Sequence, residues 1–224
     1  MEILSMKVRI HFFEEILGTA SNNPDIHSEF IASKAPDAKS MAEEISSVGT
    51  EEVIEKSMTV FPRNSEGQPF LYDYQIKGFF KDSTGVLRKV TGSKASKVKA
   101  YKKEIDGLLF VFPRQIPLNL SAPIGTCERP LRAQTAMGER IALSNSETAP
   151  AGTYIDIEIG CLTKDMMELA KECLDYGKYR GIGQWRNSGK GRFTYEVLES
   201  LRGRGEPWKC HAWICEGIAQ LRNT

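Results

Sequence analysis

A chain of 224 residues is long enough to bury a full hydrophobic core, as one domain or as two small ones. Its apolar share of 41% and charged share of 26% are typical of a globular protein and exclude a low-complexity or fibrous chain. The formal net charge of +1 does not by itself indicate a polyanionic partner, so any such case depends on local clusters of charge. Five cysteines without a regular spacing, and no signal peptide or membrane-spanning start, predict reduced thiols and a cytoplasmic location.

The chain begins with a predicted strand. Residues 6–16 are rich in β-branched and aromatic residues, with Val8 and Ile10 on one face and Arg9 and His11 on the other. This alternation indicates a half-buried strand and a structural role for His11. The elements expected next are a loop, a short helix and a further strand, at residues 17–36, 37–48 and 51–61.

Two helices and three further strands are expected in the remainder. The apolar spacing within residues 74–90 predicts a helix with basic residues on its other side. Gly78 inside it costs about 1 kcal/mol relative to alanine, which indicates the close approach of another backbone or tight packing. A second helix is expected at residues 163–176, with Thr163 as N-cap, Gly177 just past its end, and Cys173 on its apolar stripe. Other patterns predict a buried central strand, a β-hairpin and two strands, at residues 105–113, 126–143, 153–159 and 192–198, with loops or turns at 114–125 and 144–152.

A run of positive charge lies between Ser83 and Lys103, where seven residues are basic and none is acidic. Most charge runs form a solvated face, but a run of one sign that also contains Tyr101 favours contact with a phosphate backbone. Its basic residues are Arg88, Lys89, Lys94, Lys97, Lys99, Lys102 and Lys103.

A glycine-rich stretch at residues 176–199 follows the second predicted helix and runs into the last strand. Five glycines alternate with basic residues in YGKYRGIGQWRNSGKGRFTYEVLE. Glycine permits positive φ and close approach to a ligand, exposed amides form concavities for anions, and arginine supplies paired donors to phosphate. The stretch is consistent with a phosphate-binding loop and equally with a solvated basic hairpin.

The order of the strongest elements is βαββαβ, with a hairpin inserted before the third strand. This order predicts an α+β fold with a ferredoxin-like core, in which two helices cover one face of an antiparallel sheet. We expect a single domain, with its core at about residues 6–113 and 151–198, the inserted hairpin at about 114–150, and a C-terminal extension at 200–224. The glycine-rich stretch then lies at one edge of the sheet, near the end of the first helix.

The chain resembles the RAMP superfamily of CRISPR-associated proteins, and especially their backbone-forming, guide-RNA-binding subunits. The resemblance is carried by a first strand ending in glycine (VRIHFFEEILG), a KG helix (PFLYDYQIKGFFKDSTGVLRK) and a glycine-rich loop (GIGQWRNSGKGRFTYE). The strand APAGTYIDIEI is a weaker fourth similarity. Together these stretches frame roughly residues 6 to 198.

The resemblance implies a non-catalytic subunit that binds single-stranded RNA in a ribonucleoprotein of antiviral defence. The expected partners are RNA and other subunits or copies of the chain, with no membrane and no cofactor. Trp185 and Tyr179 are the candidates for base stacking. The expected RNA-binding residues are Lys77, Arg88, Lys89, Lys97, Lys99, Lys102, Lys103, Arg180, Gly181, Gly183, Trp185, Arg186, Lys190 and Arg192.

Two other functions are open. Asp25 and His27 lie in the loop after the first strand, where proton transfer with a 2′-hydroxyl would make the chain an endoribonuclease. The chain also has LYDYQI where members of the superfamily tend to have small residues, and Gln184 and Trp185 within its glycine-rich loop. These differences fit a viral interaction protein that imitates a CRISPR subunit and blocks the complex.

The sequence does not favour a metal site. Cys210, His211 and Cys215 lack the paired C-x-x-C spacing of zinc sites. Cys161 and Cys173 are expected in the core.

Overall fold

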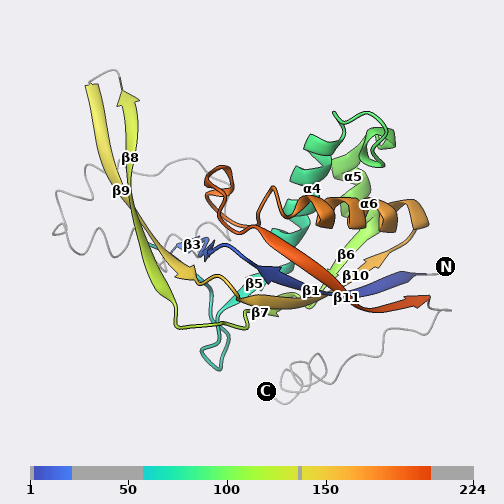
Figure 1. Cartoon of the computed structure of the whole chain (residues 1–224), viewed down its shortest axis with the longest axis horizontal. Helices are drawn as coiled ribbons and strands as arrows, with labels where there is room; N and C mark the ends of the chain where they lie inside the picture. Colours follow the sequence, from blue (N-terminus) through green and yellow to red (C-terminus); the bar gives the residue numbers. More distant parts are fainter. Residues whose placement is uncertain (1–2, 22–57, 136–137, 203–224) are drawn as a thin grey trace, which may run out of the picture.

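The computed structural model describes residues 3–21, 58–135 and 138–202, and its centre is a four-stranded antiparallel sheet (Figure 1). The spatial order of the strands is β11-β1-β10-β6. With two helical crossovers on one face, this is a ferredoxin-like α+β core, so the predicted fold class is confirmed. The strands are β1 (Leu4–Phe12), β6 (Leu109–Phe112), β10 (Tyr154–Cys161) and β11 (Phe193–Arg202).

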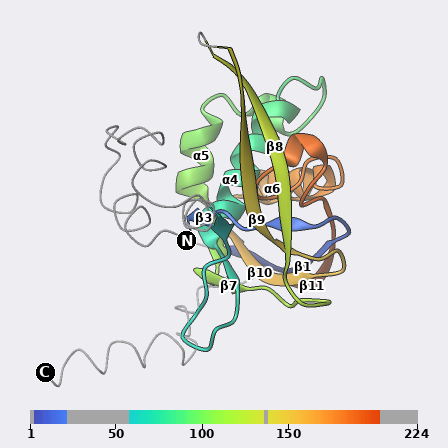
Figure 2. The same cartoon turned by 90° about the vertical axis from the view of Figure 1, so that its left-hand side faces the viewer.

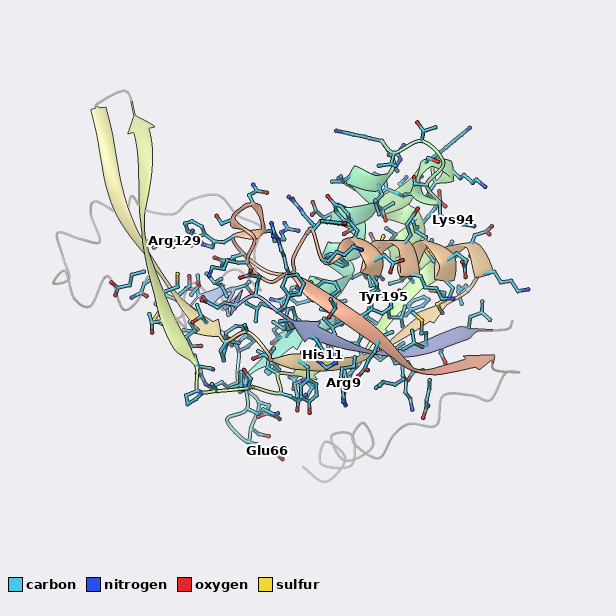
Figure 3. The ribbon with its side chains drawn as sticks, viewed as in Figure 1. Arg9, His11, Glu66, Lys94, Arg129 and Tyr195 are labelled. Carbon is cyan, nitrogen blue, oxygen red and sulfur yellow. The ribbon has the colours of Figure 1, made fainter. Side chains whose placement is uncertain are left out.

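The two faces of the sheet differ as the alternation in β1 predicts. Val8 and Ile10 are fully buried beneath the helices. Arg9 and His11 lie on the opposite face (Figure 3), where Arg9 forms two hydrogen bonds with Asp156, at 2.7 and 2.8 Å. His11 Nε2 lies 3.2 Å from a carboxylate oxygen of Glu196 on β11, which fits the structural role expected for it.

Helices α4 (Asp73–Leu87) and α6 (Lys164–Tyr176) cover the buried face (Figure 1). α6 follows its predicted range closely because Thr163 caps it, accepting a hydrogen bond from the Met166 amide at 3.2 Å. Cys161 and Cys173 are both fully buried, as predicted. Gly177 directly follows the last residue of α6, as predicted, and its backbone has a right-handed conformation.

Two expectations about strands are corrected. Residues 105–108 belong to helix α5 (Tyr101–Leu108), whose Ile105 packs into the core, so the strand predicted at 105–113 contains only β6. β6 is an edge strand and not the central strand that its apolar run predicted. An apolar run alone cannot distinguish a buried helical turn from a strand, and it cannot distinguish an edge strand from a central strand of a sheet.

The predicted hairpin is confirmed and is longer than expected. β8 (Gly125–Thr135) and β9 (Gly138–Ala149) pair along their length and project from the rest of the described fold (Figures 1 and 2). Residues 144–149 belong to β9, and Ser146 and Thr148 are buried, so the polar turn expected at 144–152 is restricted to its last residues. At its base the hairpin joins the short strands β2 (Ile16–Leu17), β3 (Ala20–Ser21) and β4 (Thr59–Val60).

One small sheet lies at the start of α4. There β5 (Phe70–Tyr72) pairs with β7 (Gln115–Pro117), inside the range expected to be a loop. The helix predicted at 37–48 lies outside the described residues, and β4 is the described part of the strand predicted at 51–61. No helix in the described ranges is both long and apolar enough to cross a membrane.

Candidate nucleic-acid interface

The glycine-rich loop, residues 177–192 of the glycine-rich stretch, is fixed at both ends by Phe193, the first residue of β11. Phe193 is fully buried and packs against Phe12 and Phe79, with ring centroids 6.1 and 5.1 Å away. A Cβ at Gly177 would collide with the Phe193 ring. The entry and exit of the stretch are therefore fixed to the core, and Gly177 is glycine because of this packing.

The space next to the glycines inside the loop is filled by the loop's own backbone. A Cβ at Gly181 would collide with the backbone of Lys190 and Gly191, and one at Gly191 with the carbonyl of Ile182. The Ile182 amide donates to the Gly191 carbonyl at 2.9 Å. These glycines allow two backbone segments to cross, so they do not by themselves indicate an anion site.

Arg180 and Arg186 both contact one carboxylate on α4. Arg180 Nε donates to Asp82 Oδ2 at 2.7 Å, and Arg186 Nη1 donates to the same oxygen at 3.0 Å. Arg180 Nη1 also donates to Asn187 Oδ1 at 2.8 Å. The hydrogen bond to Asp82 raises the pKa of Arg180. Both arginines thus hold the loop on the helix, and Arg180 in particular has few donors left for phosphate.

Two further cations of the loop, Lys190 and Arg192, are partly buried. Lys190 Nζ lies 3.0 Å from Glu15, and its side chain is only 15% exposed. The amide of Gly191 donates to the Glu15 carbonyl at 2.7 Å. Arg192 Nε is buried without a hydrogen-bond partner among the described residues. The loop is therefore rigidly seated, and much of its predicted positive charge is compensated or covered.

Trp185 joins the glycine-rich loop to the hairpin. Its φ of 57° lies in the left-handed region, where a bulky side chain is uncommon. The guanidinium of Arg129, on β8, lies 5.0 Å from the centre of the Trp185 ring. Figure 3 shows Arg129 on the side of the hairpin that faces the loop. Trp185 is therefore partly covered, whereas Tyr179, the other stacking candidate, is 64% exposed.

The exposed side of α4 is open next to this loop. Gly78 is exposed, and a Cβ added there would meet no described atom within 4 Å. Gly78 has no positive φ and no packing neighbour, so neither backbone strain nor internal packing explains it. Lys77 Nζ donates to the Asp106 carbonyl at 3.0 Å, and Lys81 Nζ lies 2.7 Å from the Asp106 carboxylate.

The basic run lies beyond the C-terminal end of α4 and continues into α5. The Arg88 guanidinium lies 5.0 Å from the centre of the Tyr101 ring. Glu172 of α6 accepts from the amides of Lys94 and Ala95, at 3.0 Å each, and so fixes the backbone of the run. Six lysines of the run are exposed, and within the described ranges none forms an ion pair: Lys89, Lys94, Lys97, Lys99, Lys102 and Lys103.

The run and the hairpin are well separated in space. Lys94 and Arg129 lie at opposite ends of the view in Figure 3, with α4 between them. The glycine-rich loop lies between α4 and the hairpin, because its arginines contact Asp82 on α4 and its Trp185 contacts Arg129 on β8.

Sequence reasoning missed an aromatic pair at the start of α4. Tyr74 is 56% exposed and stacks on Tyr72, with ring centroids 5.1 Å apart and planes at 17°. Partial burial raises the pKa of Tyr74 above its ordinary value. Arg114, which is 75% exposed, lies 3.7 Å from Asp73 beside this pair. The sequence feature that indicates this pair is the LYDY segment before Lys77, in which two tyrosines replace the small residues typical of the superfamily.

Five residues discussed from the sequence fall outside the part of the chain that the structure describes. Asp25, His27, Cys210, His211 and Cys215 lie outside the described residues. Within the described ranges no group of three or more His, Cys, Asp or Glu side chains is arranged to hold a metal ion.

Comparison with known proteins supports the fold. No protein-family model matches the chain, and no curated protein matches it in sequence. Among solved structures, the chain is similar to one in the cryo-EM structure of the Type III-B Cmr-beta complex bound to cognate target RNA. The TM-score is 0.50 and the identity 11%, over 89% of this chain and 60% of that one. The chain thus spans under two thirds of that neighbour's length, and what the two chains share is the fold.

Proposed function

We propose that the chain is a non-catalytic subunit that binds single-stranded RNA in a CRISPR-type ribonucleoprotein. The RNA backbone passes along the exposed side of α4, between the glycine-rich loop and the basic run. The observation that carries this proposal is Gly78, an exposed glycine within a helix that has open space in front of it. The shared fold with a chain of an RNA-bound Cmr complex supports it.

Gly78 leaves room for an external partner on the side of α4 that lies next to the glycine-rich loop. A glycine inside a helix costs about 1 kcal/mol relative to alanine, and nothing within the described fold offsets that cost. The glycines of the loop differ, because each of Gly177, Gly181 and Gly191 is required by its own neighbours. A glycine with free space in front of it allows a backbone to approach α4 closely.

The positive charge near the exposed side of α4 favours the binding of a polyanion. Lys77 and Lys81 share one carboxylate, that of Asp106, so this group keeps a net positive charge. Beyond the end of α4, the exposed lysines of the basic run have no described acidic partner. Flexible lysines in water bind a phosphate backbone without sequence preference, and such binding weakens steeply with salt.

The role of the glycine-rich loop in this proposal is to shape the surface. Its arginines hold it against Asp82, so it forms a fixed wall beside α4. Arg186 keeps donors that do not face Asp82, and Tyr179 is mostly exposed. These two side chains are the loop residues best placed to contact RNA directly.

The test measures the binding of a labelled single-stranded oligouridylate by fluorescence anisotropy at several KCl concentrations. The double variant Lys102→Ala, Lys103→Ala removes two exposed charges from α5. We expect the slope of log K against log salt to decrease in magnitude by up to about 1.4, since each phosphate contact on a single strand contributes about 0.7.

The matched control is Lys164→Ala with Lys171→Ala, two lysines on the solvent side of α6. This variant is expected to leave the slope unchanged. Absence of RNA binding by the unaltered chain, or equal effects of the two double variants, would contradict the proposal.

A second candidate function is that of an interaction protein that occupies a CRISPR complex in place of a subunit. The compensated charge of the glycine-rich loop favours it, because Arg180, Arg186 and Lys190 are all paired with carboxylates of the chain itself. Co-purification with CRISPR subunits, together with no RNA affinity when the chain is alone, would select this function over the first.

A further inference from the structure

We propose that Tyr74, supported by Tyr72, is a stacking platform for one nucleobase at the start of the RNA path along α4. This inference rests on the proposed function and adds a contact with a base to contacts with the backbone. None of the residues expected from the sequence to stack on a base is part of it.

The platform is anchored in the core. Phe70 is 3% exposed, and its ring meets the Tyr72 ring edge-on, with centroids 4.9 Å apart. Tyr72 in turn stacks on Tyr74 at 5.1 Å. The three aromatic rings thus lead from the buried β5 to the surface, and the outermost ring is more than half exposed.

The backbone below the platform is fixed at several points. Tyr72 pairs with Gln115 of β7, and its amide donates to the Gln75 side chain at 3.0 Å. The Asp73 amide donates to the Arg114 carbonyl at 3.0 Å. A base that stacks on Tyr74 therefore meets a ring already held in place, so little conformational entropy is lost on binding.

The surroundings of Tyr74 indicate a nucleotide. Gly78 lies one helical turn further along α4, on the same face as Tyr74, about 5–6 Å away at the Cβ positions. Arg114 is an exposed cation beside Asp73, the residue before Tyr74, and among the described residues its only ion pair is this 3.7 Å contact. A base on Tyr74 thus places its sugar and phosphates toward Gly78, Lys77 and Arg114. An exposed tyrosine surrounded only by apolar residues would instead indicate a protein partner.

The experiment compares two probes of equal length, a labelled oligouridylate and the corresponding abasic ribose-phosphate oligomer. We expect the unaltered chain to bind the base-bearing probe more tightly. Tyr74→Ala should weaken oligouridylate binding by about 5- to 150-fold and leave the affinity for the abasic probe almost unchanged. Tyr74→Phe should retain the preference, because stacking requires the ring and not the hydroxyl.

Controls separate stacking from loss of folding. Tyr154→Ala changes a tyrosine on the opposite face of the sheet, beside His11, and should leave both affinities unchanged. Circular dichroism of Tyr74→Ala should match that of the unaltered chain and its thermal unfolding should shift only slightly, because more than half of the residue is exposed.

The outcomes distinguish this inference from the proposed function. If the unaltered chain binds neither probe, both are overturned. If it binds oligouridylate with salt dependence but Tyr74→Ala does not alter the ratio of the two affinities, the stacking platform is overturned and the RNA-binding function stands. Loss of affinity for both probes in Tyr74→Ala, with folding intact, also contradicts stacking.

Discussion

Arg180 and Asp82 form the contact that seats the glycine-rich loop on α4. Arg180 Nε lies 2.7 Å from Asp82 Oδ2, and the two residues are 98 positions apart in the chain. Arg186 shares the same carboxylate, at 3.0 Å. The sequence predicted these arginines as phosphate ligands, whereas in the folded chain they first satisfy an internal anion.

Removing the charge of Asp82 should destabilise the fold modestly. Asp82→Asn keeps the shape of the side chain but removes the negative charge that accepts three hydrogen bonds from Arg180 and Arg186, whose side chains are 26% and 32% exposed. We expect the free energy of unfolding in urea to fall by about 1 kcal/mol, with a smaller difference at high salt.

Asp106→Asn is the matched control for Asp82→Asn. Asp106 also contacts two cations, but it is 53% exposed and connects only α4 to α5. Asp106→Asn should therefore lower the free energy of unfolding clearly less than Asp82→Asn does. An equal loss of stability in the two variants would show that the Asp82 contacts have no special part in holding the loop.

Replacing Gly78 should separate stability from RNA binding. Gly78→Ala fills open space in a helix, so we expect it to raise the free energy of unfolding by up to about 1 kcal/mol. The same methyl group should lower RNA affinity, because it occupies the position where the backbone approaches α4. Chemical denaturation and fluorescence anisotropy measure the two effects.

Gly107 provides the control for Gly78. It lies in α5, is exposed, and also has no described atom within 4 Å of an added Cβ. Gly107→Ala should stabilise the fold to a similar degree and leave RNA affinity unchanged. Equal RNA affinity in the two alanine variants would remove the main support for the proposed path.

The contact between Trp185 and Arg129 should restrain the hairpin. Trp185→Ala removes a cation–π interaction of about 0.5–1 kcal/mol between the loop and β8. We expect faster amide hydrogen exchange in peptides from β8 and β9, and a smaller effect for Trp185→Phe. The control is Arg88→Ala, which removes the cation–π contact with Tyr101 and should not alter hydrogen exchange in the hairpin. Faster exchange of the hairpin in Arg88→Ala would show that loss of any such contact destabilises the whole fold.

The stability of the protein should decline at alkaline pH. Burial raises the pKa of the Cys161 thiol to about 12 from an ordinary value of 9.0. Above pH 9 the unfolded chain loses this proton while the folded chain keeps it, so stability falls as pH rises from 9 to 12. This thiol contributes about 1 kcal/mol per pH unit in that range.

Urea unfolding at a series of pH values tests this expectation. Cys161→Ala should be less stable at neutral pH, because it leaves a cavity, but its stability should decline less steeply above pH 9. Cys127→Ala, at a partly exposed thiol, should leave the decline unchanged. If Cys161→Ala and the unaltered chain decline in parallel, the buried thiol does not cause the alkaline loss.

The local patterns of the sequence predicted most of the core. The alternation in β1, the apolar stripe of α6 with its Thr163 cap, and the hairpin all follow from side-chain periodicity and capping, which depend on residues near one another in the chain. The prediction was wrong at residues 105–108, where Ile105 packs into the core from a helical turn and extends an apolar run that continues in β6. A continuous apolar run has no periodicity that separates these two states.

The composition of the candidate site was also visible in the sequence, because glycines, cations and aromatic residues gather at residues 69–103 and 176–193. What only the tertiary structure decided is which of these groups are free. Asp82 pairs with the two arginines of the loop, Glu15 pairs with Lys190, and Phe193 fills the space in front of Gly177. Gly78 and Tyr74 instead face open space. Such pairing depends on distances between residues far apart in the chain, which no local pattern contains.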